Sequence, residues 1–291
     1  MKSIICKLCN SNKKSLIWND VIRSGKGKFT KKKYKIFNCL SCNVKYLEKA
    51  NKKLLNNVVF RKKFDGSNSV KKYHDFNKPR ELRKIKFIEK FISFKRKDVL
   101  ETNCGAASNL DYIVKKARST SGQDNKIYKA HVSKKHNFFA SLENLIVEKK
   151  KFDLILSLAE LEHRNDPIKF VKDLTKILKK NGKIVFRIPN FYNLYYLFLG
   201  SDFQKFDFRE SHNFYFCKKS INSLFKKLNL KVKLMKGFNE YDINHFIQFL
   251  KTKKRVETKY KKIIKSKSSQ NIVNQINSNL LSTSFIYIVS K

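Results

Sequence analysis

Apolar residues recur along the chain in two patterns that predict a layered α/β protein. Short, nearly unbroken apolar runs at 152–157 and 183–188 are typical of buried parallel strands. Residues 82–92 and 170–178 instead carry apolar side chains at helical spacing. Residues 284–289 are interpreted as an edge strand. The order of these elements predicts a doubly wound sheet with helices on both faces.

The stretch 99–114 is the centre of this predicted sheet. A short apolar strand reaches Glu101, a tight turn of small residues follows, and a helix continues beyond it. A cofactor of a doubly wound sheet lies outside the carboxyl ends of the strands, where small residues let the backbone approach it. Asn103, Gly105 and Ala107 occupy alternate positions of this turn. An ordinary strand-to-helix turn without a ligand is the alternative.

A second acidic residue, Asp124, follows Gly105 at the spacing of a ribose-binding residue, about 20 positions. It ends a predicted second strand that is poor in apolar residues, so a surface turn is the alternative. Residues 137–143 are interpreted as the third strand and its exit loop, which includes Leu142.

The segment 152–190 contains a buried strand, a polar loop, a helix and a further strand. The loop carries Leu161, Glu162 and His163. Asp166 and Pro167 have the residue types of a helix N-cap and first helical position. We expect the helix to end at 181–182, where Asn and Gly precede the strand.

The sequences FDLI, LEH, DP, NGKIVF and IPN of this segment have the order and spacing found in class I S-adenosylmethionine (SAM)-dependent methyltransferases, which the chain resembles. Residues 101–107 resemble motif I of that family, an acidic residue followed by x-Gly-x-Gly-x-Gly, with only the middle glycine present. The resemblance implies a Rossmann-like fold with a mostly parallel seven-stranded sheet, an antiparallel last strand, and SAM as cofactor. The cofactor-binding residues it implies are Glu101, Asn103, Gly105, Ala107, Asp124, Leu142, Leu161 and Glu162.

Two histidines are candidate catalytic bases, because imidazole titrates near neutral pH. His163 lies in the polar loop, and His212 follows the aromatic-rich segment 191–208, which we interpret as a lid or small insertion on the substrate side. For the aromatic-rich segment the alternative is a lipid-facing patch. For the two histidines the alternative is a structural role. The chain also resembles zinc-knuckle sugar methyltransferases of bacterial surface-polysaccharide pathways. Their His-Glu-His sequence is replaced here by Glu210, Ser211 and His212.

Four cysteines form two C-x2-C pairs near the N-terminus, Cys6 with Cys9 and Cys39 with Cys42. Two such pairs can supply four thiolates to one tetrahedral zinc ion. Four thiolates leave no open coordination position, so we expect a structural zinc that stabilises a short segment. Free structural cysteines and a redox pair are the alternatives.

The length of 291 residues allows one catalytic domain and a small appendage. We expect a zinc ribbon at 1–55, a basic linker and packing helix at 56–97 with a break at 65–68, and a methyltransferase domain at 98–291. No apolar run reaches membrane-spanning length and the start is poor in apolar residues, so we expect a cytoplasmic protein.

The chain has 66 Lys and Arg against 23 Asp and Glu, a formal charge of +43 that favours polyanions. The lysines occur in every segment and accompany abundant Asn, Ile and Phe, as A/T-rich codons would produce. We therefore favour a small-molecule acceptor, a sugar or nucleotide-sugar, over nucleic acid. An RNA methyltransferase and a catalytically silent binding module are the alternatives, and the sequence does not indicate an oligomeric state.

Overall fold

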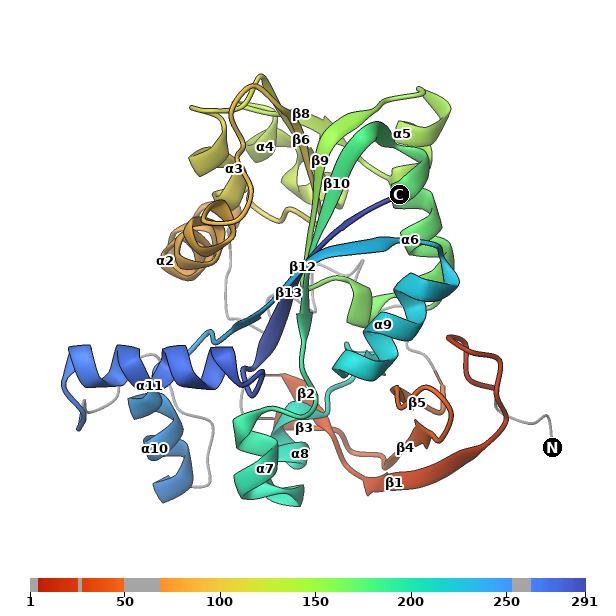
Figure 1. Ribbon diagram of the computed structural model, residues 1–291, viewed down its shortest axis with the longest axis vertical. Helices are drawn as coiled ribbons and strands as arrows, with labels where there is room; N and C mark the ends of the chain where they lie inside the picture. The colour runs from red at the N-terminus through yellow and green to blue at the C-terminus, as the bar shows by residue number, and fades with distance from the viewer. Residues whose placement is uncertain (1–4, 26–27, 50–68, 253–262) are drawn as a thin grey trace.

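A twisted seven-stranded sheet forms the centre of the computed structural model, which describes residues 5–25, 28–49, 69–252 and 263–291 (Figure 1). The strand order is β12-β13-β10-β9-β6-β7-β8. Strands β6 to β10 run parallel, and β13 is antiparallel to both of its neighbours. This arrangement confirms the predicted Rossmann-like fold. The bounds are β6 Asp98–Thr102, β7 Ser119–Gln123, β8 Asn137–Phe139, β9 Phe152–Leu158, β10 Leu178–Pro189, β12 Lys231–Phe238 and β13 Ser284–Ser290.

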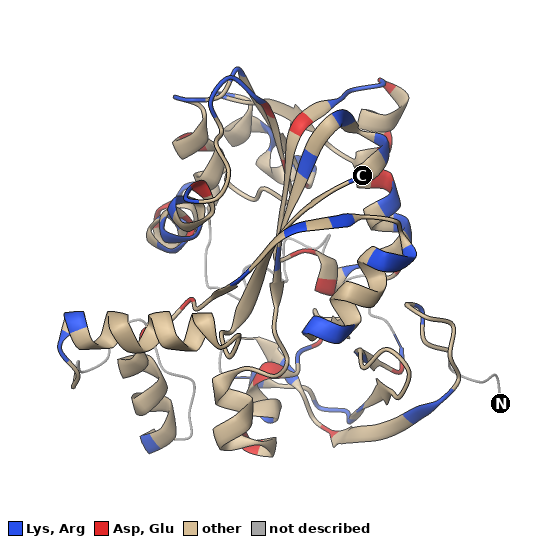
Figure 2. Cartoon of the chain, viewed as in Figure 1, with Lys and Arg blue, Asp and Glu red and all other residues tan. Residues whose placement is uncertain are grey.

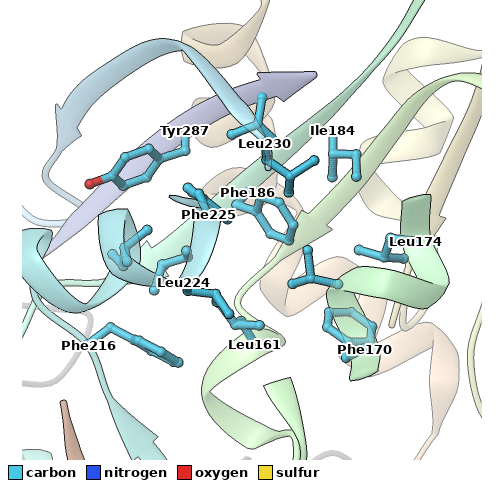
Figure 3. Close-up of a cluster of buried hydrophobic side chains, with 14 of the residues drawn as sticks. Leu161, Phe170, Leu174, Ile184, Phe186, Phe216, Leu224, Phe225, Leu230 and Tyr287 are labelled. Atoms are coloured by element: carbon cyan, nitrogen blue, oxygen red, sulfur yellow. The ribbon is translucent and has the colours of Figure 1, made fainter. Parts of the chain in front are cut away.

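Helices cover both faces of the sheet and bury a separate apolar core on each face (Figure 1). On β10, Ile184 and Phe186 face one core and Val185 faces the other, because successive side chains of a strand point to opposite faces. Figure 3 shows the first core, where Phe186 meets Phe225 of α9. One layer contains α2 Val70–Glu89, α3 Ser108–Ile113 and α4 Lys129–Val132, and the other contains α5 Leu142–Val147, α6 Pro167–Lys176 and α9 Lys218–Lys227.

The N-terminal residues form a second, four-stranded sheet of order β1-β4-β5-β11. Its first three strands come from the N-terminal segment, but β11 comes from beyond residue 210 and pairs antiparallel with β5. The chain segment that carries His212 is thereby attached to the N-terminal unit. The bounds are β1 Lys14–Asp20, β4 Tyr34–Cys39, β5 Lys45–Leu47 and β11 Phe214–Tyr215, with a small hairpin of β2 Arg23–Gly25 and β3 Lys28–Phe29.

Four further helices pack around an aromatic cluster that includes Tyr195, Phe246 and Phe249. Two of them lie in the aromatic-rich segment that follows β10, so this segment is helical. No helix in the described part of the chain is long and apolar enough to cross a membrane. The bounds are α7 Leu194–Leu199, α8 Ser201–Asp207, α10 Ile243–Thr252 and α11 Ser266–Ser278, and two short 3-10 helices are η1 Lys126–Tyr128 and η2 Leu161–His163.

Two predictions were wrong, the end of the helix before β10 and the edge position of the last strand. Helix α6 ends at Lys176, not at 181–182, because β10 already begins at Leu178, which pairs with Phe152. The register shift between Leu178 and Lys183 places Asn and Gly in an irregular part of the strand, not at a helix end. Strand β13 is not an edge strand, because it lies between β12 and β10 and its first six residues are buried.

The helix before the first central strand also begins earlier than expected. It starts at Val70, where Ser69 accepts a hydrogen bond from the Lys72 amide, and Pro79 lies inside the helix. The apolar pattern at 82–92 marks only the second half of this helix, because the residues before it carry few apolar side chains. The predicted break at 65–68 and the boundary between 55 and 56 lie outside the described residues.

Candidate active site

The turn between β6 and α3 has a left-handed backbone at three alternate residues. Asn103, Gly105 and Ala107 have φ values of 51°, 55° and 60°. Asparagine adopts this conformation readily, whereas alanine does so at a cost of roughly 1–2 kcal/mol. A Cβ atom at Gly105 would also lie 3.2 Å from Cε1 of Tyr73 on α2. The loop therefore has a glycine-type backbone at two positions where glycine itself is missing.

Glu101 lies at the end of β6 beneath this loop and is 3% exposed. Its Oε1 accepts a hydrogen bond of 2.6 Å from Asn109 Nδ2, which also donates to Glu81. Its Oε2 is buried and has no hydrogen-bond partner within the described part of the chain. Burial raises the pKa of Glu101 to about 8, and the nearby Glu81 and Asp124 add to this rise. The carboxyl group is thus prepared for a cationic partner.

The end of β7 lies against the same loop. Asp124 Oδ2 accepts a hydrogen bond of 2.6 Å from the amide of Gly105, so the carboxylate holds the loop directly. The neighbouring Gln123 has a buried Oε1 without a hydrogen-bond partner among the described residues. Gly122 lets the two segments approach, because a Cβ atom there would lie 2.7 Å from Cys104 Sγ.

Two of the residues implied to contact the cofactor have side chains in an apolar core. Leu142, at the start of α5, and Leu161, in η2, are 7% and 1% exposed. Figure 3 shows Leu161 close to Phe216 and Phe170. Their backbones nevertheless lie in the loops that follow β8 and β9, at the carboxyl edge of the sheet.

The loop after β9 brings Glu162 and His163 to this edge. Asn213 holds them, since its amide donates to the carbonyl oxygen of Glu162 and its Nδ2 donates to that of His163, both at 2.8 Å. Glu162 is 1% exposed, and its Oε2 has no hydrogen-bond partner among the described residues. Burial raises the pKa of Glu162 to about 7, although Arg187 opposes the shift.

His212 lies beside His163, with ring centroids 4.7 Å apart in an edge-to-face arrangement. As a candidate base next to a predicted lid, His212 was expected to be accessible to an acceptor, but the structure buries it to 5% exposure. Burial keeps the pKa of His212 well below its ordinary value, and the positive charge of Arg209 acts in the same direction. His212 is therefore neutral at pH 7.

The two cysteine pairs meet in the N-terminal unit, with all four sulfur atoms within 4.8 Å of one another. Both pairs have the same backbone geometry. Asn10 and Asn43, each directly after the second cysteine, have φ of 62° and donate their amides to the carbonyl of the first cysteine at 2.8 Å. Two matched turns around clustered sulfurs fit a tetrahedral metal ion.

The seven-stranded sheet, with a left-handed loop and a buried acid at the end of its first strand, defines a class I methyltransferase fold. A family model described as a methyltransferase domain matches residues 74–234, more than half of the chain. The chain belongs to this methyltransferase domain family. The structure describes all of the matched residues. The two cysteine pairs lie outside the matched region.

Comparisons with individual proteins agree with this family. Ubiquinone biosynthesis O-methyltransferase of Coxiella burnetii is 28% identical over 131 residues, 41% of this chain and 56% of the relative. The Pelagibacter ubique protein of the same name is 29% identical over 158 residues, 49% of this chain and 63% of the relative. The chain thus spans less than two thirds of these relatives. A SAM-dependent methyltransferase structure from Archaeoglobus fulgidus has the same fold, with a TM-score of 0.52, 17% identity and coverage of 75% of this chain and 99% of that one.

The structure adds residues to the surroundings of the loop that the sequence did not predict as cofactor contacts. Asn109 and Gln123 border the left-handed loop, and Tyr73 covers Gly105 from a helix that precedes it by some thirty residues. Glu160 accepts hydrogen bonds from Thr102 and Ser157 and so joins the ends of β6 and β9. Asn109 and Gln123 are sequence neighbours of the predicted site residues, whereas Tyr73 and Glu160 are distant in sequence and are brought to this edge by tertiary packing.

Proposed function

We propose that this protein transfers the methyl group of SAM to a small molecule. The observation that carries the proposal is the buried carboxyl oxygen of Glu101, which has no hydrogen-bond partner among the described residues and lies beside a loop with glycine-type backbone. Glu101 would hold the cationic methionine ammonium of SAM, and Gly105 would let the cofactor approach the backbone. Asp124, which already accepts the Gly105 amide, and Gln123 have acceptor oxygens for the ribose hydroxyls.

SAM supplies an electrophilic methyl group, so the protein's own task is to position the acceptor and manage its proton. His163 and His212 are the proposed groups for this task at the end of β9. Neutral imidazoles can accept a proton, although the lowered pKa of His212 makes it a weak base. Leu142, Leu161 and Glu162 would contact the cofactor through backbone atoms or shape the site around it.

For the acceptor we propose a hydroxyl group of a sugar or nucleotide-sugar, on the resemblance of the cysteine-bearing N-terminus to zinc-knuckle sugar methyltransferases. A phenolic hydroxyl is the second candidate, because the similar proteins from Coxiella and Pelagibacter are named ubiquinone biosynthesis O-methyltransferases. RNA is less favoured. Figure 2 shows Lys and Arg spread over many helices and strands of the described part of the chain, and not gathered on one element.

The four cysteines are proposed to bind one structural zinc ion, which would stabilise the N-terminal sheet. We retain the proposed division into a ribbon at 1–55, a linker and packing helix at 56–97 and a methyltransferase domain at 98–291, and a cytoplasmic location. The clustering of the four sulfur atoms supports a bound metal ion. Because the buried apolar core of this unit is small, a metal ion would add to its stability.

The proposal is tested by calorimetry with S-adenosylhomocysteine, followed by transfer of radiolabelled methyl from SAM to a panel of nucleotide-sugars and phenols. Glu101→Gln should weaken binding and Glu148→Gln, at an exposed position on the far end of α5, should not. Binding of S-adenosylhomocysteine without methyl transfer to any of the tested nucleotide-sugars or phenols would favour a catalytically silent binding module. Absence of binding in the wild-type protein would contradict the proposal.

A further inference from the structure

We propose that Glu162, His163 and His212 form a binding site for one divalent transition-metal ion, separate from the cysteine cluster. One potential ligand atom from each residue lies within 4.8 Å of the other two. One carboxylate and two imidazoles are a donor set that suits zinc, iron or manganese ions. The residues come from two loops, at 160–166 and 209–213, that meet at the carboxyl edge of the sheet.

The first argument is the condition of Glu162. Its side chain is buried, and its Oε2 atom has no hydrogen-bond partner in the described part of the chain. A buried carboxylate oxygen without a partner is costly, because burial removes water and nothing replaces it. A metal ion between the two imidazoles and this oxygen would remove the cost.

The second argument is the orientation of His163. Its Nδ1 lies 2.5 Å from the carbonyl oxygen of Ser211, an acceptor only, so Nδ1 carries the proton and donates it. The lone pair is then on Nε2. Metal-binding histidines usually have this arrangement, with the other ring nitrogen donating to a carbonyl or carboxylate. Ser211 directly precedes His212, so this short segment both orients His163 and supplies His212 as a ligand.

The third argument is that the site is held together before any ion binds. Asn213 ties both ligand-bearing loops through its amide and its side chain. The nearby positive charges are largely paired, since Arg187 forms an ion pair with Glu240 and Arg209 contacts Asp207 at 3.0 Å. Arg23 also acts electrostatically on His212, so the site is not free of positive charge.

Three protein ligands leave open coordination positions, unlike the four thiolates of the cysteine cluster. This step rests on the proposed function. An acceptor with two neighbouring oxygen atoms would chelate the ion, and a hydroxyl bound to it would have a lowered pKa and lose its proton to water. With the ion bound, His212 is a ligand and does not act as the base.

Manganese(II) alone is the probe, because thiolates bind this hard ion poorly. Electron paramagnetic resonance of free Mn²⁺ measures its binding to the full-length protein loaded with only one equivalent of zinc per chain, which the four thiolates bind in preference to the second site. One site per chain is expected. Glu162→Gln and His212→Gln should each weaken it at least tenfold, and Glu148→Gln should leave it unchanged. A wild-type protein that binds no Mn²⁺, or folded variants that retain full affinity, would overturn the proposal.

A second measurement covers the case in which the variants do not fold. Pulsed resonance spectra of Mn²⁺ bound to the wild-type protein should show nitrogen-14 couplings from two imidazoles, and their absence would refute the site. Binding of S-adenosylhomocysteine is measured on the same samples. If that binding fails while Mn²⁺ binds with nitrogen couplings, the methyltransferase proposal fails and the metal site stands.

Discussion

If Glu101 holds the SAM ammonium as proposed, cofactor binding should depend on pH in a direction that follows from the burial of this carboxyl group. Its pKa is raised to about 8 by burial, so the free protein holds it mainly protonated at pH 7. A cationic ammonium favours the ionised carboxylate and lowers that pKa by roughly 1–3 units. Binding must therefore release a proton, and affinity should rise with pH up to about 8.

The size of the effect follows from the ionised fraction. With a pKa of about 8, roughly a quarter of Glu101 is ionised at pH 7.5 and about one part in a hundred at pH 6. If binding lowers the pKa by roughly 2 to 3 units, to about 5 to 6, the affinity should fall about 10- to 25-fold from pH 7.5 to pH 6. This corresponds to roughly 1.4–1.9 kcal/mol.

Calorimetry with S-adenosylhomocysteine at pH 6 to 7.5 measures this dependence, because its amino group stays mostly charged there. Repeating the titration at pH 7 in buffers of different ionisation enthalpy should show close to one proton released. Glu101→Gln should bind more weakly and lose most of the pH dependence. An affinity that is flat with pH in the wild-type protein, or an unchanged slope in the variant, would refute the reasoning.

Four other changes test separate parts of the structure. Gly105→Ala should lower the free energy of unfolding by roughly 1–2 kcal/mol or more in denaturant titrations, because Gly105 has positive φ and an added Cβ would lie 3.2 Å from Tyr73; an unchanged free energy of unfolding would contradict this contact. Asp124→Ala should weaken S-adenosylhomocysteine binding by roughly 1.5–3 kcal/mol by calorimetry, and full affinity would place the ribose contact elsewhere. Cys39→Ser should lower the zinc content from about one per chain and the melting temperature, and an unchanged temperature would refute a structural ion. A raised carboxyl pKa means that the unfolded chain loses its proton first, so stability falls as pH rises from about 4.5 to about 8, and in thermal melts Glu101→Gln should reduce this fall.

The sequence predicted the central sheet well because its strands are strongly patterned. The buried run 152–157 and the N-cap at Asp166 appear in the structure as predicted, since burial on both faces and capping are local properties. Strand β13 was misjudged because its small polar residues at either end resemble the pattern of an exposed edge, although helices cover both of its faces. Burial of a strand depends on its neighbours, which the local pattern does not contain.

The candidate site was predictable only where residues follow directly on a strand. Glu101 and Asp124 each end a strand, and parallel strands end at one edge, so their closeness to the loop follows from topology. The burial of His212 and its contact with His163 could not be predicted, because they depend on the pairing of β11 with β5. The left-handed backbone of Asn103 and Ala107 could not be predicted either, because neither residue type requires this conformation.

The pairing of β5 with β11 has a consequence for the order in which the protein folds during synthesis. The N-terminal sheet contains strands separated by more than 160 residues, so the edge of β5 stays open until the ribosome has produced Tyr215 and released it. Exposed strand edges pair readily with other chains. The first residues made are therefore among the last to reach their final contacts.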